Sequence, residues 1–252
     1  MVQQDRIVLH WLDQSRSQRV VWLLEELGVE YEIVYYKRDS NHRAPPELNN
    51  VHPLGKSPVL EIFQPNGETV KLAESGWIFQ YLINKYDTAN KLKGTNETES
   101  NQINYFLHYS EGTLQPLLVG LLINHLARTR PMLPIRMLMG PCVGGINNSY
   151  YKPELLKNVK YLNDIVKQQY NKHSKYLVGG QLSAADIILS FPIQSAINRG
   201  EMLINQSLEN EYPELNEYYQ HIIKQPGWKA AVQKVKDFEK VLGDKQQPNQ
   251  VD

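Results

Sequence analysis

The chain has 252 residues, enough for one large or two modest domains that each bury a hydrophobic core. Its 27 basic and 27 acidic residues balance to a formal net charge of 0, and they form no basic stripe of the kind that binds nucleic acid. The longest apolar run, residues 117–123, is far shorter than the roughly 18 residues that span a bilayer. The polar N-terminus is unlike a signal peptide, and a single cysteine, Cys142, excludes an internal disulfide. These features predict a soluble cytoplasmic protein without a membrane-spanning segment or a nucleic-acid partner.

The first part of the chain alternates strands and helices. Residues 7–12 are an apolar run of strand type, several N-cap candidates follow in residues 13–17, and Gly28 ends the helix that they begin. Residues 30–37 alternate as a second strand. A strand, a helix and a strand within about 37 residues predict a right-handed βαβ unit. The Pro-containing loop that follows has room for one helical turn.

A hairpin and a helix come next. Residues 59–63 and 69–72 read as short strands joined by the turn residues 65–68, and Ser75 is a candidate N-cap for a helix that runs to Tyr86. Pro58 opens the first of these strands without an N–H, so its missing donor must face an edge or a bend. A cis Ser57–Pro58 bond makes such a bend and leaves the backbone of Ser57 available to a ligand.

Glu74 and Ser75 lie at a helix start, where free N–H groups and a hydroxyl attract a carboxylate and the Glu attracts an ammonium. Beside a free strand edge at Ser57, this pair suits both ends of a small peptide. An ordinary strand start and an ordinary cap explain the same residues without a ligand.

The run Pro53-x-Gly55-Lys56-Ser57-Pro58-Val59-Leu60, followed by Glu74-Ser75-x-x-Ile78, resembles the glutathione-binding half of cytosolic glutathione transferases of the serine type, in a fungal or bacterial-like branch. The resemblance implies a thioredoxin-like α/β domain of order βαβ-α-ββα, with a cis-proline before its third strand, followed by an all-α domain. It also implies that Ser57 pairs through its backbone with the cysteinyl part of glutathione. Glu74 and Ser75 then hold the γ-glutamyl end.

The second part of the chain reads as helical. The expected division is a glutathione-binding domain at 1–86, a linker at 87–100, a helical domain at 101–242 and a disordered tail at 243–252. The helical domain is expected to start with one long helix that Pro116 kinks, and residues 131–150, rich in Pro and Gly, have no assigned structure. Further helices are expected at 150–170, 183–198, 214–224 and 227–242.

Ser183-Ala184-Ala185-Asp186 has the form of a capping box at the start of an almost wholly apolar helix. Ser183 and Asp186 are therefore interpreted as structural residues, as is Pro58. The resemblance agrees, since this segment is similar to a folding signature of the family's helical domain and not to its active site.

Glutathione reacts through its thiolate, which a hydroxyl at the start of the first helix can stabilise without a metal, a further cofactor or a protein cysteine. The resemblance places the activating hydroxyl four or five residues before an arginine on that helix. Counting back from Arg19 favours Ser15, with Ser17 or a backbone N–H as alternatives. Lys56 and Arg43 are candidates for the glycyl carboxylate of glutathione. Cys142 lies far from this segment and is expected to be an incidental buried residue.

Tyr105 and Tyr109 are candidates for the wall of an apolar pocket for the second substrate, although the same stripe would serve core packing. The resemblance implies a homodimer that conjugates glutathione to hydrophobic electrophiles in detoxification, with a glutathione peroxidase activity as a further option. The competing interpretation is a non-catalytic binding or regulatory module of the same fold.

Overall fold

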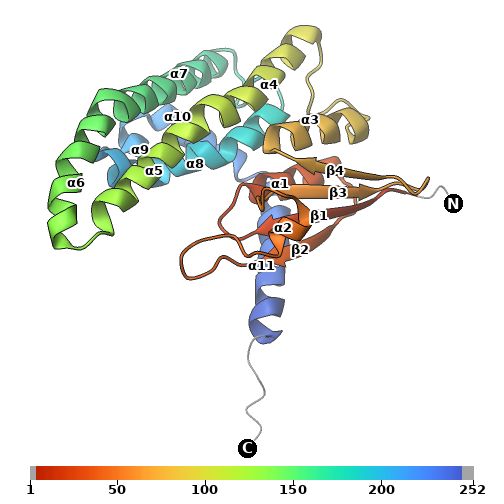
Figure 1. The fold of residues 1–252 in the computed structure, drawn as a ribbon. Helices are drawn as coiled ribbons and strands as arrows, with labels where there is room; N and C mark the ends of the chain where they lie inside the picture. Colours follow the sequence, from red (N-terminus) through yellow and green to blue (C-terminus); the bar gives the residue numbers. More distant parts are fainter. Residues whose placement is uncertain (1–3, 246–252) are drawn as a thin grey trace, which may run out of the picture. The chain divides into compact units, whose positions relative to one another are not determined.

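The computed structural model describes residues 4–245 and divides them into two compact units (Figure 1). The first unit contains the chain up to Asp87 together with the segment from Ile223 onward, and the second is Thr88–Ile222. The expected linker, residues 87–100, starts at this boundary, but its last residues already belong to the first helix of the second unit, which begins at Glu97.

A four-stranded mixed sheet of order β2-β1-β3-β4 forms the centre of the first unit. Its strands are β1 (Arg6–Leu12), β2 (Glu32–Tyr36), β3 (Val59–Phe63) and β4 (Thr69–Ala73). β1 is parallel to β2 and antiparallel to β3, and β3 is antiparallel to β4. Six of the seven residues of β1 are buried, as a central strand requires. The predicted thioredoxin-like order is confirmed.

Two longer helices complete the predicted βαβ-α-ββα order. α1 (Ser17–Leu27) connects β1 to β2 and ends at Gly28, which caps it in the left-handed conformation with a φ of 63°. α3 (Ser75–Tyr86) follows the hairpin and buries its apolar stripe. The one helical turn that the loop had room for is α2 (Leu48–Val51). The expected cap at Ser75 is wrong by one position, because Ser75 is the first helical residue and Glu74 occupies the N-cap position without a side-chain capping bond.

The last helix, α11 (Pro226–Lys245), belongs to the first unit and runs along α1, which corrects the expectation that it closes the helical domain (Figure 1). Trp228 meets Trp22 of α1 edge to face, with ring centroids 5.1 Å apart. The ammonium of Lys234 lies 3.6 Å from the ring centroid of Tyr31. The helix also covers residues 243–245, which were expected to be disordered, and the rest of that expected tail lies outside the described residues.

The second unit is helical. Its elements are α4 (Glu97–Tyr109), α5 (Gln115–Thr129), α6 (Leu133–Ile146), α7 (Lys152–Asn171), α8 (Ala184–Ile204), α9 (Leu208–Glu211) and α10 (Pro213–Ile222). A π-helical turn at Ser110–Leu114 joins α4 to α5 just before Pro116. The expected long helix is therefore present, and its irregularity is a widened turn placed next to the proline, which has no N–H to donate.

The segment without a sequence assignment is α6 and a second π-helical turn, Asn147–Tyr151. Pro134 lies in the first turn of α6, where the missing N–H costs nothing, but Pro141 lies inside the helix. Cys142 is exposed on this helix, which corrects the expectation that it is buried. Among residues 4–245, no helix is long and apolar enough to cross a membrane.

α8 begins with the predicted capping box, which the structure confirms. One carboxylate oxygen of Asp186 accepts the N–H and the hydroxyl of Ser183, both at 2.8 Å. The other accepts the N–H of Leu177 at 2.9 Å and the hydroxyl of Tyr218 at 2.8 Å. Burial raises the pKa of Asp186, while these four donors act in the opposite direction. The structural interpretation of Ser183 and Asp186 therefore has a direct physical basis.

Candidate functional site

Three serines from two distant segments form a continuous chain of hydroxyl groups. The Oγ atoms of Ser15 and Ser17 are 2.8 Å apart, and those of Ser17 and Ser57 are 2.6 Å apart. The Ser57 hydroxyl donates to the carbonyl oxygen of His10 at 2.8 Å. We call Ser15, Ser17 and Ser57 the serine cluster.

The sheet brings the serine cluster together. Ser15 follows β1 and Ser17 begins α1, while Ser57 precedes the cis bond to Pro58 and the start of β3. β1 and β3 are antiparallel neighbours whose pairing begins at His10 and Val59, so the end of one strand lies beside the start of the other. Ser57 thus lies just outside the ladder, next to the first turn of α1.

The direction of the hydrogen bonds in the serine cluster follows from its fixed end. The His10 carbonyl can only accept, so the one hydrogen of Ser57 is used there and Ser17 must be the donor to Ser57. The same reasoning makes Ser15 the donor to Ser17. Ser15 Oγ in turn accepts the N–H of Ser17 at 3.2 Å. Ser15 is therefore the first donor of the chain, polarised by a backbone N–H at a helix start.

Exposure separates the two candidate hydroxyl donors. Ser17 has no exposed surface, whereas Ser15 keeps 8%. If the hydroxyl of Ser15 turns to a ligand, the links from Ser17 to Ser57 and on to His10 remain intact, whereas turning Ser17 would interrupt the chain in its middle. The geometry favours Ser15 over Ser17 as the group that meets an anion.

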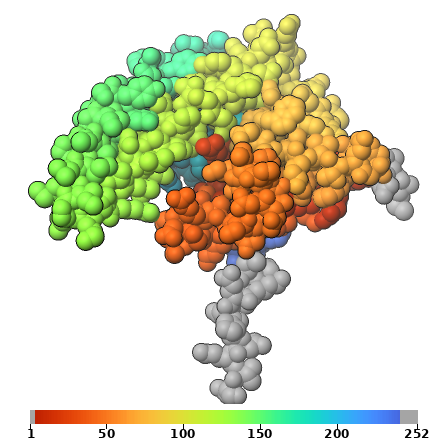
Figure 2. Space-filling model, in the orientation of Figure 1, coloured from red at the N-terminus to blue at the C-terminus, as the bar shows by residue number. Residues whose placement is uncertain are grey.

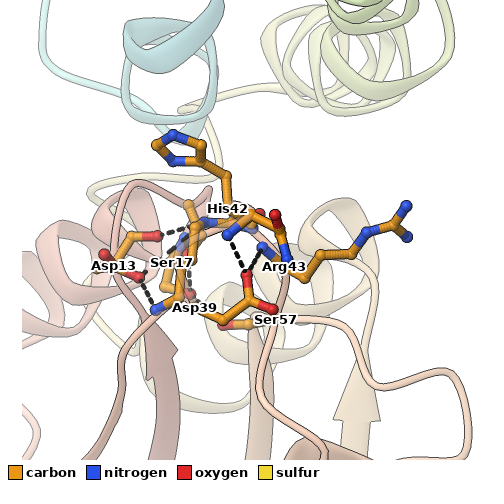
Figure 3. A network of polar contacts seen from close by, with 9 residues as sticks. Asp13, Ser17, Asp39, His42, Arg43 and Ser57 are labelled. Carbon is orange, nitrogen blue, oxygen red and sulfur yellow. Dashed lines mark hydrogen bonds and ion pairs between the residues drawn. The ribbon is translucent and has the colours of Figure 1, made fainter.

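Beside the serine cluster, polar contacts connect the loop that follows β1 to the loop that follows β2 (Figure 3). A carboxylate oxygen of Asp13 accepts the N–H of Arg38 at 2.8 Å, and Arg38 Nε donates to the Asp13 carbonyl at 3.0 Å. Arg38 also donates to the carbonyl of His42. The negative charge of Asp13, which would repel a thiolate, is thus committed to Arg38.

Arg43 lies in the loop that Asp39 organises. Asp39 Oδ1 accepts the N–H of Arg43 at 2.7 Å, and the Arg43 carbonyl accepts the N–H of Asp39 at 3.0 Å. The side chain of Arg43 is exposed and extends away from these contacts (Figure 3). Lys56 is exposed as well, directly before Ser57. Both cations are available to an anionic ligand.

Glu74 and Ser75 have unusual backbone and burial features for a helix start. Glu74 has a φ of 72°, a left-handed conformation that costs a non-glycine residue of order 1–3 kcal/mol and is common at ligand sites. Its side chain is exposed, whereas Ser75 is buried and accepts a long hydrogen bond of 3.4 Å from buried Arg19 of α1. The strained backbone thus presents a carboxylate at the N-terminus of α3.

A second polar network on the sheet was not identified from the sequence. His10 joins the hydroxyl of Tyr36 and the carboxylate of Glu61, each at 2.9 Å, and Lys71 reaches the same carboxylate at 2.9 Å. Burial alone would raise the pKa of Glu61, but the hydrogen bonds from Lys71 and His10 lower it below its ordinary value. The side chain of His10, whose carbonyl oxygen ends the hydroxyl chain, is therefore hydrogen-bonded to both neighbouring strands, β2 and β3. In the sequence, the only signal that could have revealed this network is the alternation of polar residues along the neighbouring strands.

Tyr105 and Tyr109, the candidates for the second-substrate pocket, stack with centroids 5.7 Å apart on α4 of the helical unit. Tyr109 is buried and its hydroxyl donates to Asn158 at 2.8 Å. Tyr105 is 49% exposed, so it presents a ring face and Tyr109 supports it from behind. Within the described residues, no group of His, Cys, Asp or Glu is arranged to hold a metal ion.

The chain is similar to known proteins over nearly its whole length. The family described as "Glutathione S-transferase, N-terminal domain" matches residues 5–84, and "Glutathione S-transferase, C-terminal domain" matches residues 146–234. Glutathione S-transferase 1 of Saccharomyces cerevisiae is 39% identical over 91% of this chain and 95% of its own length. Glutathione S-transferase 3 of Schizosaccharomyces pombe is 30% identical over 92% and 88%. A glutathione S-transferase structure from Actinobacillus pleuropneumoniae superposes with a TM-score of 0.64 at 30% identity, covering 90% of this chain and 92% of that one.

Proposed function

The chain belongs to the glutathione S-transferase family. We propose that it ionises the thiol of glutathione at Ser15 and transfers the glutathionyl group to hydrophobic electrophiles in the cytoplasm. The observation that carries the proposal is the direction of the serine cluster, in which Ser15 is the first donor and is more exposed than Ser17, the other candidate donor. The hydrogen that Ser15 donates to Ser17 can turn to an anion that arrives at the helix start, and the links from Ser17 to Ser57 and from Ser57 to His10 are kept.

Ionising the glutathione thiol near neutral pH requires only a modest stabilisation of the thiolate. A free thiol has a pKa near 8.5, and lowering it by about two units takes roughly 2.7 kcal/mol in favour of the anion. A hydrogen bond to a charged group contributes roughly 1.5–3 kcal/mol, and a helix N-terminus about 0.3–1 kcal/mol. Ser15 and the start of α1 together are sufficient. The thiol proton leaves to solvent, the thiolate forms a carbon–sulfur bond, and the leaving group departs with the electrons of the broken bond.

Glutathione is proposed to lie along the edge that begins at Ser57. The Ser57 backbone, outside the β1–β3 ladder, pairs with the cysteinyl part and holds the thiol near Ser15. Glu74 takes the ammonium of the γ-glutamyl end, and Ser75 with the N-terminus of α3 takes its carboxylate. Lys56 and Arg43 attract the glycyl carboxylate. The exposed ring of Tyr105 is proposed to contact the electrophile.

Turnover separates an enzyme from a binding module. We expect the purified chain to bind glutathione resin and to conjugate glutathione to a chlorodinitrobenzene-type substrate. Assays with a hydroperoxide, which two glutathione molecules reduce to an alcohol and water while forming their disulfide, test the peroxidase option. Retention on the resin without turnover of any of several electrophiles or hydroperoxides would favour the regulatory-module interpretation instead.

Replacing Glu74 by alanine is expected to weaken glutathione binding about tenfold to a hundredfold, the effect of losing one charge-assisted contact. Calorimetric titration with glutathione measures it. Glu68→Ala, in the exposed turn of the β3–β4 hairpin, is the matched control and should bind like the parent chain. Equal affinities for all three proteins would show that the γ-glutamyl site lies elsewhere.

We further propose that the chain forms a homodimer through α3. Trp77 is 52% exposed and meets Tyr81 edge to face, an unusual aromatic pair for a free surface. Light scattering should give about twice the chain's 29.2 kDa, and Trp77→Arg should shift the mass toward that of the monomer. Met202→Arg, an exposed apolar residue of α8, should leave the mass unchanged. A monomeric parent chain would contradict the proposal.

A further inference from the structure

The helical unit exposes a concentration of large apolar side chains where α5 meets α6. We call residues 123–146 the hairpin tip. Seven of the fourteen large hydrophobic side chains that are exposed among the described residues lie in it. They are Ile123 (59% exposed), Met132 (79%), Leu133 (72%), Ile135 (56%), Met137 (74%), Leu138 (74%) and Ile146 (50%). Figure 2 shows this segment, in green, as a projecting lobe of the helical unit.

α6 is the element that makes the hairpin tip unusual. Arg136 is its only charged residue, and a helix that is apolar on nearly all sides is normally enclosed by other protein or by lipid. Only Val143 of α6 is buried, so α5 covers one strip of the helix and the remaining sides are open. Exposed apolar surface of this extent marks a binding surface for protein or membrane.

The charges around the hairpin tip have one sign. Arg128, Arg130 and Arg136 are exposed within it. The sequence contains no Asp or Glu from residue 112 to residue 153, although the whole chain has equal numbers of acidic and basic residues. The tip therefore combines protruding apolar side chains with a local positive potential.

We propose that the hairpin tip inserts into the headgroup and upper acyl region of an anionic bilayer and holds the protein on the membrane surface. Met and Leu side chains enter the acyl boundary while the guanidinium groups bind lipid phosphates, the division of roles found in interfacial helices. A second copy fits this surface less well, because a two-fold contact brings two copies of the same positively charged patch together. Lipid also needs no complementary groove.

This inference does not depend on the proposed function, since no residue of the serine cluster lies in the hairpin tip. It also differs from membrane spanning, for which no described helix is suited. The chain offers its own probe: its single cysteine, Cys142, is exposed on α6.

The first experiment labels Cys142 of the full chain with an environment-sensitive fluorophore. Vesicles of equal parts phosphatidylserine and phosphatidylcholine should shift its emission to the blue, and brominated acyl chains in those vesicles should quench it. Phosphatidylcholine alone should have a much smaller effect, and added salt should weaken the response. An unchanged emission with the anionic vesicles would overturn the proposal.

The second experiment measures flotation of unlabelled variants with the same vesicles. Replacing Arg128, Arg130 and Arg136 by glutamine should weaken binding about a hundredfold, from about fivefold for each cation near an anionic surface. The matched control replaces the exposed cations Lys172, Lys175 and Arg199 of the helical unit by glutamine and should float like the parent chain. Equal losses of vesicle binding in the two triple variants would show that binding depends only on net charge. That result would overturn the proposal that the hairpin tip is the binding surface.

The apolar part is tested with Met137→Glu combined with Leu138→Glu, two side chains that are 74% exposed. This variant should lose flotation at least tenfold, whereas Met202→Glu should not. Circular dichroism verifies that both remain folded. If the double variant instead lowers the mass in light scattering, and the parent chain does not float, the tip is an interface between copies and the membrane proposal is wrong.

Discussion

Replacing Ser15 by alanine is expected to lower turnover about tenfold to a hundredfold at about pH 6.5, with much less effect on glutathione affinity. The hydroxyl does little for a neutral thiol, but it donates a hydrogen bond that only the thiolate needs. Its loss therefore raises the pKa of the bound thiol toward the free value. The deficit in turnover should shrink as the pH rises toward about 9, where the thiol ionises unaided.

The decisive measurement is an absorbance titration of the bound thiolate, in the ultraviolet, for the parent chain and two serine variants. Ser17→Ala removes the acceptor of the Ser15 hydroxyl but leaves the Ser17 N–H that holds Ser15 Oγ, so the titration should stay near that of the parent chain. A shift with Ser17→Ala and none with Ser15→Ala would reverse the two roles. If neither variant shifts the titration, a backbone N–H at the start of α1 stabilises the thiolate.

Replacing Asp186 by alanine is expected to destabilise the helical unit by about 3–5 kcal/mol, because each buried polar group left without a partner costs roughly 1–3 kcal/mol. Asp186 is fully buried and its carboxylate accepts hydrogen bonds from Ser183, Leu177 and Tyr218. These contacts connect the start of α8 to the preceding loop and to α10. Their loss would release three segments at once.

Urea unfolding followed by circular dichroism checks this expectation, with the midpoint of the helical transition as the readout. Asp186→Asn keeps the volume but turns one acceptor into a donor facing other donors, so it should also lower the midpoint. Asp164→Asn, on the exposed side of α7, is the control and should leave it unchanged. A midpoint for Asp186→Ala equal to that of the control would show that the capping box contributes little to stability.

The strands, the main helices and two local motifs, a hairpin and a capping box, were predictable from the sequence. The hairpin at Val59–Phe63 and Thr69–Ala73 follows from alternation and a turn with Gly67, and the capping box at Ser183 follows from residues three positions apart. Both depend on interactions within a few residues of chain. A cis Ser57–Pro58 bond was one way to make the bend expected at this proline, the family resemblance implied it, and it is present.

Other features were decided by packing between distant segments. α11 follows the helical part of the chain in sequence, but it packs along α1 of the first unit. Tyr109 and Tyr105 share a helical stripe, yet only the tertiary fold makes one a buried donor to Asn158 and the other a surface ring. Periodicity gives the face of a helix but not what covers that face.

The candidate site shows the same division. Ser15 was chosen by counting back from Arg19, as the family resemblance implies, and the Ser57–Pro58 step was identifiable because proline chemistry is local. The hydroxyl chain was not, because Ser17 and Ser57 lie 40 residues apart and meet only when β3 pairs with β1. The order of amino acids alone specifies which groups this protein carries at the ends of its strands and helices. The pairing of the strands decided which of those groups touch, because a hydrogen bond requires contact within about 3 Å, and residue spacing along the chain does not define that distance.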